Sequence, residues 1–196
     1  MLPPFRWRLG SIAGLENVPR GRGFLLAANH IDFLDGFFIT AALWDGTRPI
    51  KFLSKTKNYW WTGGSTIPVD ADKRAASLDE AFAALQSGAV IAVFPEARRN
   101  GHGPLTNGRT GLARMALRTG VPVLPVGIRG SSGRNSLHSV FLYFLTGHKF
   151  SLMIGQPLMY PIDTAQKYPK ERLHNVMAEV MQRISKLCGL DYSPES

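Results

Sequence analysis

A histidine and an aspartate, His30 and Asp35, form the residue pair in this sequence that is best suited to acid–base chemistry. Both lie in the stretch LLAANHIDFLDGFF. An imidazole that donates one N–H to a carboxylate keeps its other nitrogen free to act as a general base. On a regular helix, a spacing of five residues would leave the two side chains roughly 140° apart. They can meet only if His30 lies in a loop and Asp35 on the first turns of the next helix. Asp32 supports this arrangement, because it is a favoured N-cap just before an apolar run.

The same residues also have a purely structural interpretation. Asp32 and Asp35 would then form a carboxylate-rich helix start that the helix dipole favours, and His30 would only satisfy hydrogen bonds in a loop. The spacing taken alone favours this interpretation, because His-x4-Asp is a pattern of low specificity.

A second polar cluster, PEARRN at 95–100, directly follows an apolar run. A carboxylate and two guanidiniums after a buried strand indicate that they bind something or each other. Arg99 could hold a phosphate through two parallel hydrogen bonds. The alternative is a surface ion pair between Glu96 and an arginine. Lys73 and Arg74, farther upstream, could add to a phosphate site or remain solvated charges.

Short apolar β-rich runs alternate with helical patterns, which is typical of an α/β fold. Several strands are apolar on both faces, which indicates a mainly parallel sheet flanked by helices. We expect strands at 24–28, 50–54, 66–69, 90–94, 123–128 and 150–154, and helices at about 33–43, 75–86, 108–118 and 170–187. Functional loops gather beyond the carboxyl ends of parallel strands, so Asn29-His30 and residues 95–100 are expected at one rim.

The bulk composition fits a single globular domain of 196 residues, with 44% hydrophobic and 19% charged residues. Lys and Arg outnumber Asp and Glu by 23 to 14, which gives a net charge of +9 and a pI near 10.1. This balance favours a polyanionic neighbour, although a basic surface on an ordinary soluble protein would give the same numbers. The basic residues are scattered and no nucleic-acid motif is present, so an anionic membrane surface is the preferred neighbour. The single cysteine, Cys188, fits a reducing compartment.

Any contact with a membrane is expected from the side. No apolar run reaches the ~18 residues that a membrane-spanning helix needs, and MLPPFRWRLG at the start lacks the apolar core of a signal peptide. Residues 5–8 could sit at an interface or form a frayed terminus. Residues 140–145, VFLYFL, could dip into a bilayer or line an acyl tunnel; a place in the core, as a strand or short helix, is the preferred interpretation.

Four motifs, taken in order, resemble those of the phospholipid and glycerol-phosphate acyltransferase family, whose members acylate lysophosphatidic acid and related lipids. Asn29, His30 and Asp35 match its Asn-His-x4-Asp signature. Residues 64–71, 94–100 and 121–126 resemble its Gly-x-Ile-x-Val-Asp-Arg, Phe-Pro-Glu-Gly-Thr-Arg-Ser and Val-Pro-Val-x-Pro-Val blocks. The resemblance runs from about residue 23 to residue 157. Four motifs in the right order and with suitable gaps form a specific match, so the resemblance favours the catalytic interpretation of His30 and Asp35.

Three positions depart from the family pattern. Ala71 stands where the family usually has Arg, Ala97 replaces Gly, and Arg98 replaces Thr. Gly tolerates a positive φ and Ala does so poorly, so Ala97 is expected to change the backbone. The lost cation at Ala71 and the added one at Arg98 bear on the acceptor more than on the acyl-transfer chemistry.

The resemblance implies one acyltransferase domain over 1–196, with a motif-bearing core at about 23–157 and a C-terminal helix at about 170–187. The implied reaction moves a fatty acyl group from acyl-CoA or acyl carrier protein to the hydroxyl of a lysophospholipid, with 1-acylglycerol-3-phosphate as the first choice. His30 would be the general base and Asp35 would orient it. The implied substrate-binding residues are Asn29, Glu96, Arg99, Arg98, Lys73 and Arg74.

No metal is expected, and no cofactor beyond the acyl thioester co-substrate. The implied location is the cytoplasm, where the protein would associate peripherally with the cytoplasmic face of an anionic membrane. Two alternatives stay open: a different lysolipid acceptor, such as a lyso-aminolipid, and a non-catalytic lipid-binding relative. The intact His30, Asp35 and Glu96 argue against the second.

Overall fold

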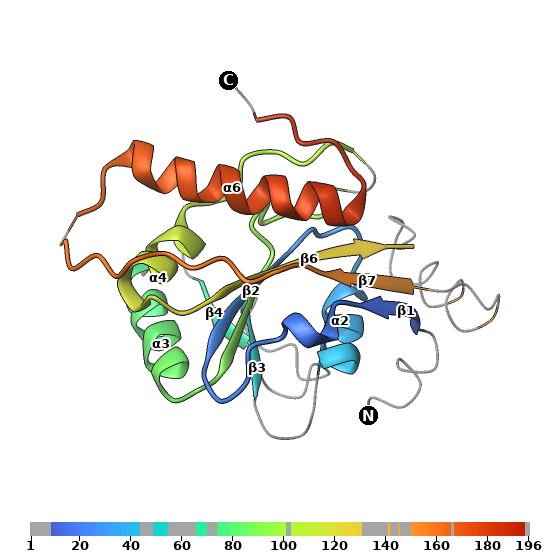
Figure 1. The fold of residues 1–196 in the computed structure, drawn as a ribbon, viewed down its shortest axis with the longest axis horizontal. Coiled ribbons are helices and arrows are strands. Elements are labelled where there is room, and N and C mark those ends of the chain that lie inside the picture. The colour runs from blue at the N-terminus through green and yellow to red at the C-terminus, as the bar shows by residue number, and fades with distance from the viewer. Residues whose placement is uncertain are drawn as a thin grey trace.

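The computed structural model describes residues 9–43, 49–54, 66–69, 74–100, 103–130, 141, 145, 150–165 and 167–194. Within these ranges, helices lie on both faces of a seven-stranded sheet (Figure 1). The strands are β1 Leu9–Ala13, β2 Phe24–Ala28, β3 Ile50–Ser54, β4 Thr66–Pro68, β5 Val90–Val93, β6 Val123–Arg129 and β7 Phe150–Ile154. The helices are α2 Asp35–Leu43, α3 Arg74–Gln86, α4 Gly111–Thr119 and α6 Lys170–Cys188, and a 3-10 helix spans Leu15–Asn17.

The sheet has the order β1-β7-β6-β2-β5-β3-β4. Its central strand, β2, pairs in parallel with both β5 and β6. Among the described strand pairs, only β6 and β7 are antiparallel, so β7 and its parallel neighbour β1 run against the other strands. The expected α/β fold with a mainly parallel sheet is therefore confirmed. Strand β1 was not expected, because an edge strand bonds on one side only and LGSIA is mostly exposed or half-buried.

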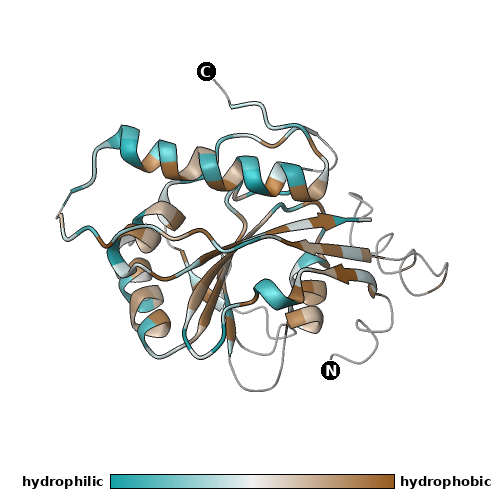
Figure 2. Ribbon diagram, in the orientation of Figure 1, coloured by the Kyte–Doolittle hydropathy of each residue, from teal (hydrophilic) through white to brown (hydrophobic). Residues whose placement is uncertain are grey.

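The core consists of two apolar layers, one on each face of the sheet. On β2, Leu25 and Ala27 face the layer formed with α3, α4 and α6, whereas Phe24, Leu26 and Ala28 face the layer that includes α2. Burial on both faces explains why β2 reads as an uninterrupted apolar run. Figure 2 shows the same distribution, with hydrophobic residues concentrated on the strands and hydrophilic ones alternating with them along α6.

The C-terminal end of α6 lies directly against β6. A Cβ atom built on Gly127 would be 2.4 Å from both the Leu187 carbonyl carbon and the Cys188 nitrogen, so only glycine allows this approach. Arg129 Nε donates to the Leu187 carbonyl oxygen at 2.9 Å and thereby satisfies one of the last carbonyls of the helix. Because β6 neighbours β2, this contact supports the strand that leads into His30.

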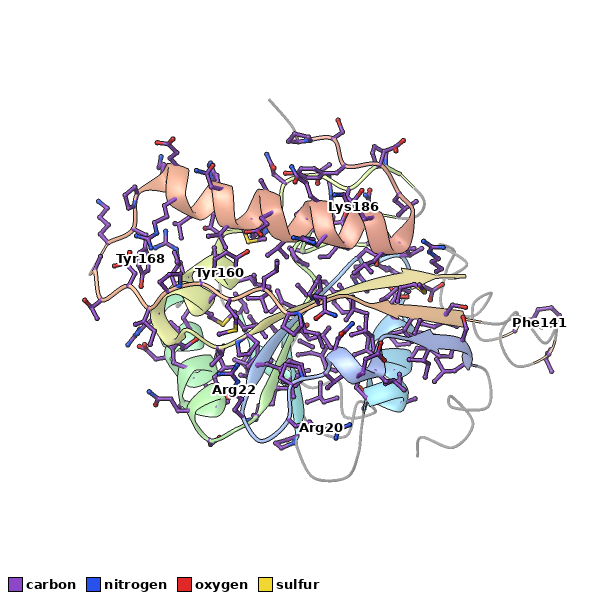
Figure 3. All side chains as sticks on the ribbon, in the orientation of Figure 1. Arg20, Arg22, Phe141, Tyr160, Tyr168 and Lys186 are labelled. Atoms are coloured by element: carbon purple, nitrogen blue, oxygen red, sulfur yellow. The ribbon has the colours of Figure 1, made fainter. Side chains whose placement is uncertain are left out.

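No helix in the described part of the chain is long and apolar enough to cross a membrane. Phe141 and Leu145 are 56% and 72% exposed, and Figure 3 places Phe141 at the periphery of the molecule. The preferred core position of residues 140–145 is therefore wrong for these two. A run of apolar residues favours burial, but the run alone does not show which surface covers it. The remaining residues of that run, and residues 5–8, lie outside the described residues.

Candidate active site

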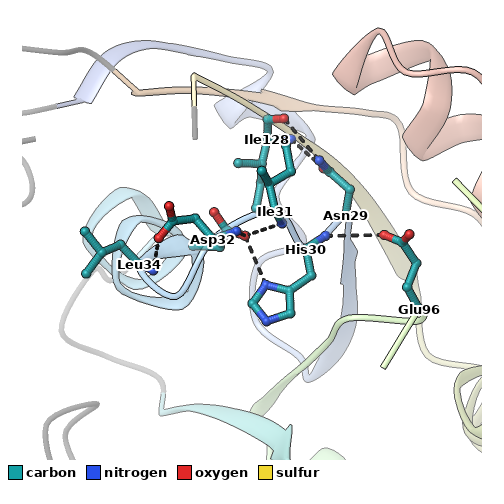
Figure 4. Close-up of polar contacts among 8 residues, drawn as sticks. Asn29, His30, Ile31, Asp32, Leu34, Glu96 and Ile128 are labelled. Carbon is teal, nitrogen blue, oxygen red and sulfur yellow. Dashed lines mark hydrogen bonds and ion pairs between the residues drawn. The ribbon is translucent and has the colours of Figure 1, made fainter. Parts of the chain in front are cut away.

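His30 lies in the loop directly after β2, and Asp35 is the first residue of α2. The His30 Nδ1 atom is 3.0 Å from Asp35 Oδ2. The structure thus meets the geometric condition that the five-residue spacing imposed, with the histidine before the helix and the aspartate on its first turn. Figure 4 shows the imidazole directed toward the start of α2.

The Asp35 carboxylate binds both the histidine and the backbone at the start of the helix. Its Oδ2 atom also accepts the backbone N–H groups of Ile31 and Asp32, both at 2.7 Å. Asp32 Oδ1 accepts the N–H of Leu34 at 3.0 Å, so the carboxylates of Asp32 and Asp35 both bind backbone N–H groups at the start of α2, an arrangement similar to a capping box. The structural and the functional interpretations of this stretch therefore describe one arrangement, in which the helix cap holds the partner of His30 in place.

The hydrogen bonds around Asp35 determine which imidazole nitrogen is free. An ionised carboxylate only accepts hydrogen bonds, so its bond to a neutral His30 requires the proton on Nδ1. Nε2 is then the nitrogen without a proton and can take one from a substrate. Asp35 has no exposed surface, whereas the His30 side chain is 21% exposed. A molecule arriving from solvent can therefore reach the imidazole but not its partner.

The loop after β5 holds His30 from the other side. The ring of Phe94 stacks on the imidazole, with centroids 4.1 Å apart and planes inclined by 16°. The His30 carbonyl oxygen accepts the N–H of Asn100 at 2.8 Å, and the His30 N–H donates to Glu96 Oε1 at 3.4 Å. Both polar groups of the His30 backbone are thus bonded to residues of one loop. The expectation that residues 29–30 and 95–100 share a rim is correct.

Glu96 is a buried carboxyl group, with 8% of the residue exposed. Its Oε2 atom is buried and has no hydrogen-bond partner in the described structure. Burial raises the pKa of Glu96, and this effect exceeds the opposing influence of the His30 N–H, the Asn100 side chain and the charges of His30 and Arg98. Burial therefore makes the charged form of Glu96 less favourable than that of a carboxyl group in water.

Asn29 is fully buried, and both ends of its amide bond to β6. Its Nδ2 donates to the carbonyl oxygen of Ile128 at 3.1 Å, and its Oδ1 accepts the Ile128 N–H at 2.7 Å. The sequence led us to expect a substrate contact here, but such a contact would require these two bonds to break. In the structure, Asn29 fixes the end of β2 to β6 and thereby fixes the start of the His30 loop.

The four expected basic residues are not equally placed. Arg98 and Arg99 are exposed on the loop that carries Glu96. Arg74 begins α3, but its side chain and the whole of Lys73 lie outside the described residues. Within the described part of the chain, no three His, Cys, Asp or Glu side chains gather closely enough to hold a metal ion.

Sequence reasoning missed three contributors to the site, namely Phe94, Asn100 and Ile128. Phe94 and Asn100 bound the second polar cluster, so their positions in that motif were a usable signal. Ile128 offered none, because it contributes only backbone atoms and lies 99 residues from Asn29 along the chain.

The match to known proteins covers most of this architecture. A family model described as Acyltransferase matches residues 11–129. The chain belongs to this acyltransferase family. The expected family and the expected type of enzyme are thereby confirmed, while the extent of the domain beyond the matched residues stays a prediction.

Two relatives of this acyltransferase are 1-acyl-sn-glycerol-3-phosphate acyltransferases by name, the first of them a probable one. A probable 1-acyl-sn-glycerol-3-phosphate acyltransferase of Mycoplasma pneumoniae is 26% identical, over 90% of this chain and 71% of that protein. A 1-acyl-sn-glycerol-3-phosphate acyltransferase of Chlamydomonas reinhardtii is 30% identical, over 62% of this chain and 39% of that protein. The crystal structure of the lysophosphatidic acid acyltransferase PlsC from Thermotoga maritima superposes with a TM-score of 0.61 at 25% identity, covering 93% of this chain and 75% of that one.

Ala97, which replaces the family's glycine, has a φ of 57°, in the left-handed region. This conformation costs an L-residue with a Cβ atom about 1–2 kcal/mol, whereas glycine adopts it freely but loses about 0.5–1 kcal/mol of extra chain entropy on folding. We therefore expect Ala97→Gly to raise the free energy of unfolding by about 0.5 kcal/mol in urea titrations.

Gly88→Ala is the matched control for Ala97→Gly. Gly88 has a φ of +88°, and nothing lies within 4 Å of the Cβ atom that alanine would add. The substitution therefore adds only the backbone penalty and should lower the free energy of unfolding by about 1 kcal/mol. A loss of stability in Ala97→Gly as well would mean that packing of the Ala97 methyl group outweighs the strain.

Proposed function

We propose that this acyltransferase moves a fatty acyl group from a thioester, acyl-CoA or acyl carrier protein, to the free hydroxyl of a lysophospholipid, with 1-acylglycerol-3-phosphate as the first acceptor to test. One observation carries the proposal. The Nδ1 of His30 lies 3.0 Å from a fully buried Asp35 oxygen while the imidazole itself stays partly exposed. This is the arrangement that a general base for a hydroxyl group requires.

In the proposed reaction, His30 Nε2 removes the proton from the acceptor hydroxyl as its oxygen attacks the thioester carbonyl carbon. The new C–O bond forms, the C–S bond breaks, and the imidazolium returns the proton to the leaving thiolate. Asp35 holds the ring orientation and stabilises the imidazolium between these two proton transfers. No protein nucleophile is needed, because the acceptor supplies one and a thiolate leaves readily.

The acceptor's phosphate is assigned to the exposed arginines beside the site. Arg98 and Arg99 follow Glu96 on the loop that holds His30, and a guanidinium can bind a phosphate through two hydrogen bonds. The names of the two relatives support a phosphate-bearing acceptor. Arg98 replaces a family threonine, which keeps a second acceptor, such as a lyso-aminolipid, worth testing. Lys73 and Arg74 remain candidates for the same phosphate.

The proposed place of the reaction is the cytoplasmic face of a membrane. A lysophospholipid and its product both partition into the bilayer, so an enzyme acting on them gains from contact with that surface. The net charge of +9 favours an anionic leaflet. Co-sedimentation with liposomes that contain or lack anionic lipid measures this part of the proposal separately from catalysis.

The test of the function is thiol release from acyl-CoA or acyl carrier protein, with and without 1-acylglycerol-3-phosphate. We expect release to require the acceptor and to fall to background in His30→Ala. We expect Arg99→Ala to raise the KM for the acceptor by on the order of tenfold, which corresponds to the loss of one charged contact.

Arg118→Ala is the matched control for Arg99→Ala, because Arg118 is an exposed arginine on α4 that pairs with Asp79. Its kinetics should equal those of the wild type. Transfer that survives in a folded His30→Ala protein would rule out the proposed base. An unchanged KM in Arg99→Ala, together with faster transfer to an uncharged lysolipid, would overturn the phosphate acceptor.

A further inference from the structure

The Glu96 carboxyl is a buried polar group that has no role in the proposed reaction, and one of its oxygens has no hydrogen-bond partner in the described structure. Family resemblance had suggested that it binds the acceptor. We propose instead that Glu96 is a positioning residue, whose Oε1 atom holds the backbone of His30 in its reactive place. The inference rests on the proposed role of His30 as the base.

The geometry of the loop supports a positioning role. The N–H of Ala97 donates to the Phe94 carbonyl oxygen at 3.0 Å, which closes a turn with Pro95 and Glu96 at its centre. Pro95 has a fixed φ that suits the second position of such a turn. The turn directs Glu96 back toward β2, where its Oε1 receives the His30 N–H (Figure 4).

Three contacts from this one loop constrain His30. Phe94 covers one face of the ring, Glu96 accepts the backbone N–H, and Asn100 donates to the backbone C=O. Asn100 is itself tied to the Pro104 carbonyl oxygen through its side chain. Asp35 fixes the orientation of the imidazole, while this loop fixes the backbone that carries it.

The burial of Glu96 argues against a direct contact with the acceptor. One oxygen is engaged by His30, and the other is buried without a hydrogen-bond partner in the described structure. A carboxylate that binds a polar substrate must offer it an accessible oxygen. The His30 N–H needs only an acceptor oxygen at the position of Oε1, and a carboxylate and a neutral carboxyl group both provide one. The positioning role therefore depends on the length of the side chain and an acceptor oxygen, but not on negative charge.

Two substitutions separate length from charge. Glu96→Gln keeps the length and an acceptor oxygen but removes the charge, and Glu96→Asp keeps the charge but withdraws the oxygen by one methylene. We expect Glu96→Gln to retain kcat within about threefold of the wild type. Glu96→Asp should lose on the order of 10- to 100-fold in kcat, as expected for a displaced catalytic group, with little change in the KM for the acceptor.

A second readout follows His30 itself. The chain has five histidines, and the imidazole signals of His30 in ¹⁵N-labelled protein are those that vanish in His30→Ala. We expect Glu96→Gln to leave these signals and the pH dependence of kcat in place, and Glu96→Asp to shift both. Glu80→Gln, on the exposed surface of α3, is the control for loss of a carboxylate and should match the wild type.

The reverse pattern would overturn the inference. An active Glu96→Asp with an inactive Glu96→Gln, or a raised acceptor KM with unchanged His30 signals, would mean that the charge of Glu96 contacts the acceptor. Failure of the proposed function is distinguishable, because His30→Ala would then remain active whatever the Glu96 variants do.

Discussion

Replacing Asp35 by asparagine will lower kcat for acyl transfer by about 10³- to 10⁴-fold, the range expected when a histidine base loses the carboxylate that orients it. Asp35 Oδ2 accepts three donors, namely His30 Nδ1 and the N–H groups of Ile31 and Asp32. The asparagine oxygen can keep the backbone bonds that start α2. It supplies no negative charge for the imidazolium, and an amide NH₂ turned toward His30 would favour the wrong tautomer.

Asp32→Asn is the matched control for Asp35→Asn. Asp32 is also a fully buried aspartate in the same turn, and its Oδ1 bonds the N–H of Leu34. Losing the charge there should cost stability on the scale of a helix cap, about 1 kcal/mol, and change kcat by only a few fold. Steady-state kinetics and thermal unfolding of both variants give the comparison. Equal losses of kcat would show that Asp35 acts only through the start of α2.

Gly127→Ala will destabilise the fold more than any other single methyl group considered above, by about 3 kcal/mol, at the upper end of overpacking effects. The new Cβ atom would lie 2.4 Å from main-chain atoms of Leu187 and Cys188. Backbone atoms cannot rotate away as side chains can, so β6 and the end of α6 have to separate. Arg129, two residues along β6, would then lose its bond to the Leu187 carbonyl oxygen.

This damage should reach the active site. Gly127 directly precedes Ile128, whose backbone holds both ends of the Asn29 amide. We therefore expect the Gly127→Ala protein that remains folded at low temperature to have a lower kcat as well. Urea unfolding followed by circular dichroism measures the stability, and thiol release measures the activity.

Gly111→Ala provides the contrast for Gly127→Ala. Gly111 begins α4, and nothing lies within 4 Å of its added Cβ atom. Alanine should be neutral there or raise the free energy of unfolding by about 0.5 kcal/mol, because it favours the helix. A similar loss of stability in both variants would mean that the close approach of α6 to β6 is not what destabilises Gly127→Ala.

The pattern of apolar and polar residues within each segment was enough to predict most of the helices and strands. Strands β2, β3 and β7 begin and end at the residues expected from the sequence. Strand β2 is buried on both faces and is apolar throughout, whereas β3 and β7 alternate between buried and half-buried residues, and both patterns are typical of strands. The helices shift by only one to three residues at their ends. Strand β1 and the exposure of Phe141 were not predictable, since both depend on which neighbours the fold supplies.

The five-residue spacing of His30 and Asp35 was enough to predict that the two side chains meet only at a loop-to-helix junction, because over so short a distance the local backbone geometry fixes where they point. The sequence by itself could not determine what Glu96 and Asn29 touch. Their partners, His30 and Ile128, lie 66 and 99 residues away, and β5 and β6 bring them together only by pairing on either side of β2. Tertiary structure made that choice, because the order of strands in a sheet depends on the packing of the whole chain and not on the pattern within any one strand.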